Sequence, residues 1–533
     1  MQNCVKNHEH SKASGSVPLP SRVLDLECCT NRTEIRLQQT GGLHGTYAAL
    51  SHCWGQTGHF TTSRASIAAR REGIKIEELP QTFQDAVEIV RRVGVRYLWI
   101  DSLCICQDDL EDWARESADM AAVYSNAHLT IAAAHARDSS AGCFNQRPER
   151  RHILIDVTGQ DGTTRQLLAF LLSPGKEALS RSYLEMKDEP LTKRAWALQE
   201  RLMGPRILHY CTDQMYYECK QEFLSEDGFR EPRRYCDLFE PAASAVVCRQ
   251  SQHSADHGLW YYLLWAYGTR RLSEPSDKLP AMSGLARMFE SRIQASYVAG
   301  LWSNALVEGL AWQGLLSTKD PATPTSQAYI APSWSWASFD GIAAAGTGKD
   351  WSDIATVLDY HVELKTSNPY GELKGGWIRI RAPLVPVSLS DEPEEDENKV
   401  PHKRYVRLKR ARGNPFGHYA VFDNIESHND ETARGFIQNL KLSALVLRRH
   451  DPTDEQKGVK KEEKEDGQEG EEGEEDKEAG NNSDFFYMAL IVVATSNDSG
   501  RMRRIGWTFL DPEISEGRTV LDELSEFQTV VLV

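Results

Sequence analysis

The stretch YLWIDSLCICQ, from Tyr97 to Gln107, decides how the first half of the chain folds. Four apolar residues, Tyr97 to Ile100, form a run with the length of a buried strand, and this run ends at an acid, Asp101. In open α/β sheets, the carboxyl ends of the parallel strands face the crevice in which ligands bind. The stretch therefore predicts a buried strand with Asp101 at the mouth of such a crevice.

Strands and helices alternate on both sides of this stretch. The apolar patterns predict three strands, at 47–52, 95–100 and 128–134, with a helix before the second strand at 80–93 and another before the third, after Asp108 and Asp109. Gly94 suits the end of the first helix, and Asp108 or Asp109 can cap the start of the second. This alternation favours an α/β domain with a parallel sheet and crossover helices.

At 533 residues the chain is too long for one ordinary core. The patterns divide it into a disordered lead at 1–20, an α/β domain with extra N-terminal strands at 21–220, a helical module at 221–330 and a β-rich region at 331–533. Large apolar residues at helical spacing define the helical module, and we expect its tryptophans, and those up to Trp336, to be core residues.

Two acidic tracts, 391–397 and 451–484, interrupt the β-rich region. Residues 451–480 hold 14 acidic and five basic residues, so they contribute −9 of the formal net charge of −16. Because both tracts lack the apolar residues that offset ordering entropy, we expect disordered insertions in loops. The remaining charge of −7 argues against a general nucleic-acid-binding surface.

Targeting and cysteine patterns point to a cytoplasmic protein. The chain begins without a signal-like segment, and its apolar runs are too short to span a bilayer, so we expect no membrane span. The 11 cysteines have unpatterned spacings, which fits reduced thiols better than a disulfide framework. Cys104 and Cys106 could bind zinc together with His128 or His135, but no paired ligand spacing supports this, and we expect no metal there.

Three blocks of sequence together resemble the fungal heterokaryon incompatibility (HET) domain. They are YAALSHCWG at 47–55, YLWIDSLCICQ at 97–107 and RAWALQE at 194–200, and later blocks such as PSWSWAS at 332–338 resemble segments that commonly follow this domain. One position departs from the family pattern, because Cys106 stands where relatives usually carry Asn. The family is linked to non-self recognition between fungal strains and to programmed cell death.

The HET domain is in turn similar to TIR domains, some of which cleave NAD with a glutamate on a helix. The resemblance implies a TIR-like, flavodoxin-like parallel sheet, with Glu200 as the catalytic carboxylate four residues after Trp196. It also implies that Asp101 orients the substrate, and that Ser51, Trp54 and Trp196 bind it. NAD would then be the substrate, while no further cofactor is implied, and no glycine-rich phosphate loop is present.

Each of these residues also has a structural interpretation. Asp101 could hold the following loop by accepting backbone N–H bonds, and Glu200 could pair with Arg194 or Arg201 on a helix surface. Ser51 and His52 are adjacent strand residues that point to opposite faces, so they cannot work as a nucleophile and base pair, and packing is expected of them.

Two functions therefore remain open. The first is a HET-domain protein of heterokaryon incompatibility and programmed cell death, acting through TIR-like NAD cleavage. The second is a non-enzymatic interaction module that relays non-self recognition. A HET protein that has lost its activity is a further interpretation, and the Cys106 departure is compatible with it. In either case we expect another protein, an incompatibility partner or sensor, to contact this chain, and self-association to help close the site.

Overall fold

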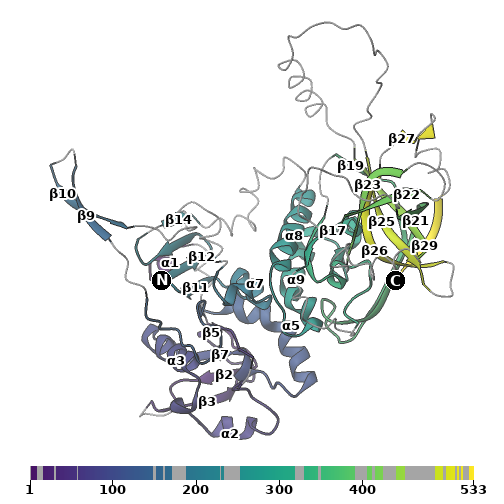
Figure 1. The fold of residues 1–533 in the computed structure, drawn as a ribbon. Helices are drawn as coiled ribbons and strands as arrows, with labels where there is room; N and C mark the ends of the chain where they lie inside the picture. The colour runs from purple at the N-terminus through teal and green to yellow at the C-terminus, as the bar shows by residue number, and fades with distance from the viewer. Residues whose placement is uncertain are drawn as a thin grey trace. The chain divides into compact units, whose positions relative to one another are not determined.

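The structure is a computed structural model, and it divides the chain into two compact units (Figure 1). Unit 1 comprises Met1–Val246, Arg270–Leu272 and Ala281–Leu285, and unit 2 comprises the remainder. The residues described are 2–8, 16–28, 32–56, 58–147, 152–159, 162–170, 186, 188–228, 230–232, 252–317, 329–345, 350–389, 405–410, 415–423, 440–450, 486–495, 500–510, 513–514, 518–519 and 527–533.

Four parallel strands form the centre of the sheet in unit 1. Their spatial order is β7 (Tyr97–Ile100), β5 (Tyr47–Ser51), β8 (Leu129–Ala132) and β11 (Arg206–Tyr210), so the first of them in the chain, β5, lies between the second and the third. Every residue of β5 and β8 is buried, as expected for strands covered on both faces. This confirms the α/β class predicted from the alternating pattern.

Helices connect these strands as the sequence predicts. In α3 (Gln81–Val93), Phe83, Ala86, Val87 and Val90 are buried on one face, and Gly94 ends the helix in the left-handed conformation with φ of 80°. The helix α5 (Leu110–Asn126) begins at Asp109, whose side chain accepts hydrogen bonds from the N–H groups of Glu111 and Asp112. Glycine and aspartate thus set the ends of the two crossover helices.

Antiparallel strands extend the sheet on both sides to ten strands. Beyond β7 lie β2 (Arg22–Asp25), β3 (Glu34–Gln39) and β6 (Ile74–Lys75), and beyond β11 lie β12 (Met215–Cys219), β13 (Glu222–Ser225) and β14 (Arg230–Pro232). Unit 1 also holds the hairpin of β9 (His152–Thr158) and β10 (Thr164–Phe170), the pair of β1 (Val17–Pro18) with β4 (His44–Gly45), and the helices α2 (Ile67–Glu72), α4 (Asp101–Cys104) and α7 (Trp196–Met203).

The beginning of the chain differs from the prediction of a disordered lead. Gln2–Asn7 forms a short helix, α1, and Val17–Pro18 pairs as β1. Cys4 and His8 are buried, although the surrounding sequence is polar. The reason is tertiary: Cys219 at the end of β12 lies against His8, with 3.5 Å between Cys219 Sγ and His8 Nδ1, a contact that local composition does not reveal.

Unit 2 combines helices with antiparallel strands. Its helices are α8 (Gln252–Gly268), most of α9 (Ser283–Ile293) and α10 (Leu306–Leu310), and they belong with the later strands rather than forming a unit of their own. Trp260 of α8 is buried against Phe289 and Trp302, and its indole N–H donates to the carbonyl of Gly300. The prediction that the tryptophans up to Trp336 are core residues is confirmed for Trp260, Trp302, Trp312, Trp334 and Trp336, which are buried, whereas Trp265 is half-buried.

Six strands of unit 2 pair in a closed ring. In order around the ring they are β21 (Leu373–Leu389), β22 (Tyr405–Arg410), β23 (Pro415–Phe422), β26 (Arg501–Leu510), β25 (Phe486–Ala494) and β24 (Leu442–His450), which pairs again with β21. The other strands are β15 (Tyr297–Val298), β16 (Leu301–Trp302), β17 (Trp312–Ser317), β18 (Gly341–Ala345), β19 (Trp351–Asp353), β20 (Thr356–Leu364), β27 (Glu513–Ile514), β28 (Arg518–Thr519) and β29 (Phe527–Leu532).

A buried arginine joins the ring to the preceding segment of unit 2. Arg504 of β26 pairs with Asp423 at 2.8 Å, donates to the carbonyls of Leu310 and Trp312, and stacks on the Trp312 ring. A buried guanidinium requires such partners, because desolvation makes an unpaired charge costly. The two predicted acidic insertions, 391–397 and 451–484, lie outside the described residues.

In the portion of the chain that the structure describes, no helix combines the length and apolar character that crossing a membrane requires.

Candidate active site

Ser51 and Glu200 meet at the carboxyl edge of the parallel strands. Ser51 is the last residue of β5, and Glu200 lies in α7, 149 residues later in the chain. The Ser51 hydroxyl donates a hydrogen bond to Oε2 of Glu200, and both side chains are buried. The structure thus brings together a predicted binding residue and the predicted catalytic residue.

Asp101 lies beside this pair because of strand register. Leu50 of β5 pairs with Ile100 of β7, so the residues that follow them, Ser51 and Asp101, leave the sheet side by side. One carboxylate oxygen of Asp101 accepts the N–H of Ser102 at 2.7 Å, and the other accepts the indole N–H of Trp54 at 2.9 Å. Asp101 therefore holds the following turn by accepting a backbone N–H, as its structural interpretation predicts. It also fixes the indole ring of Trp54, which is a predicted binding residue.

Arg194 supplies the positive charge of the site. Its guanidinium donates a hydrogen bond to the carbonyl of His52, directly after Ser51. Burial lowers the pKa of Arg194, but the negative charges of Glu200 and Asp101 outweigh this effect, so the net shift is upward. Arg194 is therefore a permanent cation that faces two carboxylates.

Burial raises the pKa of Glu200 to about 7. The charge of Arg194 and hydrogen bonds from Ser51 and Tyr124 lower the pKa, and the charge of Asp101 raises it, but desolvation is the largest effect. The interpretation of Glu200 as a member of a surface ion pair is wrong, because its side chain is 2% exposed and Arg201 pairs with Glu218 at 2.8 Å. A carboxyl group near its pKa at neutral pH can act either as a charge or as a proton donor.

His52 contributes a neutral imidazole to the same cluster. Burial lowers its pKa to about 4, although Asp101 lies 3.8 Å from Nδ1 and acts in the opposite direction. The ring packs edge-on against Phe83, as the predicted packing role requires. Within the described part of the chain, however, neither ring nitrogen has a hydrogen-bond partner, which is unusual for a buried histidine.

Two residues next to Asp101 and Glu200 in the chain also have buried side-chain atoms without a hydrogen-bond partner among the described residues. Among the described residues, the Ser102 hydroxyl and the Gln199 side-chain nitrogen have no partner, while Gln199 Oε1 accepts the N–H of Gly284 at 2.7 Å. A buried polar atom left without a bond costs about 1 to 3 kcal/mol. His52, Ser102 and Gln199 are the chain neighbours of Ser51, Asp101 and Glu200, so each residue of the cluster has a buried polar neighbour with unused hydrogen-bonding capacity.

Trp196 lies one helical turn before Glu200 at the start of α7. Its side chain is half-buried and packs against the core of unit 1. The spacing predicted from the resemblance therefore puts Trp196 and Glu200 on the same face of the helix.

Sequence reasoning missed Tyr124 of α5 as a member of the site. Its hydroxyl donates to the carbonyl of Leu50 at 3.1 Å, and the same group lowers the pKa of Glu200. In the sequence, Tyr124 is one of several large residues on the buried face of a helix, and no local signal separates it from its neighbours.

The cysteines of the second block do not form a metal site. Asp101–Cys104 is a helical turn instead of a continued strand, so Cys104 is buried in the core, while the Cys106 thiol donates to Asp108 at 3.3 Å. His128 and His135 are not grouped with them as metal ligands among the described residues.

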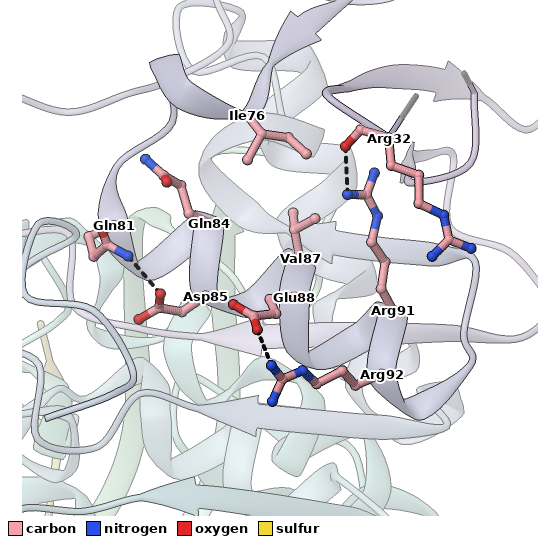
Figure 2. Close-up of a pocket in the computed structure, with 9 residues that line it drawn as sticks. All are labelled: Arg32, Ile76, Gln81, Gln84, Asp85, Val87, Glu88, Arg91 and Arg92. Carbon is pink, nitrogen blue, oxygen red and sulfur yellow. Dashed lines mark hydrogen bonds and ion pairs between the residues drawn. The ribbon is translucent and has the colours of Figure 1, made fainter. Parts of the chain in front are cut away.

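A separate cavity of about 550 Å³ lies along α3 (Figure 2). Its charged groups largely satisfy one another: Glu88 pairs with Arg92 at 2.5 Å, and Arg91 donates to the Arg32 carbonyl at 2.9 Å. None of the residues predicted for the active site lines it, so we assign it no part in the chemistry. Its lining is Arg32, Ile76, Gln81, Gln84, Asp85, Val87, Glu88, Arg91 and Arg92.

Residues 47–200 match the family described as "Heterokaryon incompatibility protein (HET)". No curated protein and no solved structure matches the chain. The matched segment begins at the first residue of β5 and ends at Glu200, so it contains Ser51, Asp101 and Arg194 as well.

Proposed function

We propose that the chain, whose residues 47–200 match the HET family, acts in heterokaryon incompatibility, and that it does so by cleaving NAD at Glu200. The observation that carries the proposal is the buried pair of Ser51 and Glu200, which joins the first and last blocks of the domain at the carboxyl edge of its parallel strands. Loss of NAD would then cause the programmed cell death that follows contact between incompatible strains.

The strand order supports a TIR-like, flavodoxin-like fold for this domain. Numbered along the chain, the parallel strands β7, β5, β8 and β11 have the order 2-1-3-4. In flavodoxin-like sheets of order 2-1-3-4-5, ligands bind where the order reverses, between the first and third strands. That position lies at the ends of β5 and β8, where Ser51 pairs with Ala132.

The proposed reaction needs one carboxylate and one water molecule. The bond between nicotinamide and ribose breaks, and its electron pair leaves with nicotinamide, which becomes neutral. The ionised Glu200 stabilises the positive charge on the ribosyl carbon, and water attacks this carbon, losing one proton. The products are nicotinamide, ADP-ribose and a proton. Arg194 suits the diphosphate of the substrate, since arginine binds phosphate oxygens well.

The burial of Glu200 means that the domain must open for a substrate to enter. His52, Ser102 and Gln199, the chain neighbours of Ser51, Asp101 and Glu200, carry polar atoms without a partner among the described residues, and opening would make them available to a polar ligand. We infer that self-association or a partner protein shifts the domain toward the open form, in keeping with a protein whose toxicity is conditional.

The test is incubation of the purified full chain with NAD, at low and at high protein concentration, with nicotinamide and ADP-ribose measured by chromatography. Glu200→Gln should abolish product formation and remain folded. Glu116→Gln is the matched control, because Glu116 is also buried and also accepts a hydrogen bond from a serine, Ser21. Equal rates in wild type and Glu200→Gln, or no products from wild type at any concentration, would remove the enzymatic proposal.

A second candidate function is a non-enzymatic relay through protein contacts. The observation in its favour is the hairpin of β9 and β10, which extends from unit 1 (Figure 1). Its first strand exposes Ile153, Leu154, Ile155 and Val157, which are between 42% and 64% exposed. Exposed apolar groups of this kind mark contact surfaces. If Leu154→Asp abolishes toxicity while Glu200→Gln preserves it, the relay is favoured over the enzyme.

A further inference from the structure

We propose that Cys4, His8 and Cys219 bind a zinc ion that fastens the N-terminal helix to the sheet of unit 1. The three residues are buried, and their potential ligand atoms all lie within 4.8 Å of one another. None of them belongs to the HET match or to the cluster around Glu200. The site is therefore separate from the proposed activity.

The geometry of the three ligands suits a tetrahedral ion. Cys4 and His8 are four residues apart, and the His8 N–H donates to the Cys4 carbonyl at 3.1 Å, so the helical turn of α1 continues to His8 and puts both side chains on one face. Thiolate sulfur and imidazole nitrogen on one zinc ion lie about 3.5 Å apart, given bonds of about 2.3 and 2.0 Å. Cys219 Sγ lies 3.5 Å from His8 Nδ1.

The carboxylate of Glu222 lies behind the His8 ring. With Nδ1 of His8 facing Cys219, its other ring nitrogen, Nε2, faces Glu222 Oε1 at 3.7 Å. Metal-binding histidines commonly present their second nitrogen to a carboxylate, which fixes the ring and strengthens it as a ligand. Glu222 is held in turn by Arg230, with which it forms an ion pair.

The donor set selects the metal. Two thiolates and one imidazole favour zinc over magnesium or calcium, which prefer oxygen ligands. Two thiolates also neutralise the charge of Zn²⁺, which suits a buried position. Three protein ligands leave the fourth tetrahedral position to a water molecule.

The ion would stabilise a helix that cannot persist by itself. Six residues, Gln2–Asn7, are far fewer than the roughly 12 to 15 that an isolated helix needs in water. Zinc would tie this helix to β12, which lies next to β11 at the side of the parallel strands (Figure 1).

The test measures metal in the intact chain, purified under reducing conditions from zinc-supplemented medium. Elemental analysis should find one zinc per chain in wild type, and Cys4→Ser, His8→Ala and Cys219→Ser should each reduce it at least tenfold. Cys28→Ser is the control, since Cys28 lies in the same unit but outside the cluster. It should retain the zinc.

Cobalt substitution of the wild-type protein gives a readout that needs no variant. Bound Co²⁺ should produce the intense visible absorption of a tetrahedral site with thiolate ligands, and added zinc should remove it. Absence of both zinc and the cobalt absorption in wild type would overturn the proposal, and so would zinc retained by all three ligand variants. A Cys4–Cys219 disulfide in the freshly isolated protein, detected by peptide mass, would also overturn it.

Discussion

The hydroxyl of Ser51 donates a hydrogen bond to the carboxylate of Glu200 inside the segment that matches the HET family. The two residues come from a strand end and a helix that are 149 positions apart, and neither side chain is more than 4% exposed. Burial and the charge of Asp101 raise the pKa of this acid, while Arg194, Ser51 and Tyr124 lower it.

Ser51→Ala should raise the pKa of Glu200 further above 7. The hydrogen bond from Ser51 favours the charged carboxylate, and a bond of this kind is worth about 1 to 1.5 kcal/mol, or about one pH unit. If ionised Glu200 cleaves NAD, the rising limb of the pH–rate profile should move to higher pH while the maximal rate falls less. An unchanged position of the rising limb would show that the Ser51 hydroxyl does not influence the pKa of Glu200.

Glu200→Gln should make the free energy of unfolding depend on pH in a range where two opposite contributions cancel in the wild type. The folded-state pKa of Glu200 is raised from 4.5 to about 7, so its contribution to stability is present below pH 4.5 and lost as the pH rises through 7. The pKa of His52 is lowered from 6.5 to about 4, so its contribution is present above pH 6.5 and lost as the pH falls through 4.

These two contributions oppose each other between pH 4.5 and 6.5. In Glu200→Gln only that of His52 remains, so the free energy of unfolding should rise with pH across this window, by on the order of 3 kcal/mol. Urea unfolding of both proteins at several pH values measures the difference. Parallel stability curves would show that the two groups do not titrate as described.

Asp101→Ala should lower stability as well as any activity. The carboxylate accepts the N–H of Ser102 and the indole N–H of Trp54, and hydrogen bonds to charged groups are worth about 1.5 to 3 kcal/mol each. We expect a loss of roughly 3 to 6 kcal/mol, measured by thermal unfolding. Lost activity at unchanged melting temperature would instead make Asp101 a purely chemical group.

Gly284→Ala should disrupt the packing next to Glu200. A Cβ atom at Gly284 would lie 2.1 Å from the Cβ of Ala121 and 2.7 Å from Oε1 of Gln199, so the backbone must move. Overpacking of this kind costs about 1 to 3 kcal/mol or more. The control is Gly258→Ala in α8, where nothing lies within 4 Å and where alanine should stabilise by about 0.5 to 1 kcal/mol. Equal effects of the two substitutions would contradict the packing described.

Replacement of residues 451–485 by Asn-Gly should leave the fold of unit 2 intact. His450 and Phe486 are paired across β24 and β25, and their rings stack 4.6 Å apart, so a two-residue hairpin turn can connect them. Thermal unfolding should show an equal or higher melting temperature, because a shorter loop costs less entropy to close. A fall of more than about 5 °C would mean that the acidic tract contributes to stability.

The sequence predicts the elements of the parallel sheet well because its signals are local. The apolar runs of β5 and β7, the terminal Gly94 of α3 and the capping Asp109 of α5 are each read within a few residues of the chain. The helix α4 shows the limit of such reasoning. The predicted strand ends at Asp101 as the structure shows, but the helical turn that begins there, in which Asp101 accepts the N–H of Ser102, has no signal in the pattern of apolar residues.

Much of the site was less accessible from sequence. Family blocks identify Ser51, Asp101 and Glu200, but the burial of Glu200 and its bond to Ser51 depend on how β5, β7 and α7 pack. Tyr124 and the buried thiol of Cys4 gain their neighbours only through distant parts of the chain. Contacts of this kind leave no periodic pattern, so composition and spacing could not reveal them.

The distance along the sequence between Ser51 of β5 and Glu200 of α7 has a consequence for protein synthesis. Ser51 leaves the ribosome long before its partner, and at about 5 to 20 residues per second the 149 residues between them take roughly 7 to 30 s to make. A nascent chain therefore has no complete Ser51–Glu200 pair during this interval. If that pair is toxic when active, the cell gains an interval in which quality control can remove an unfinished chain before it can do harm.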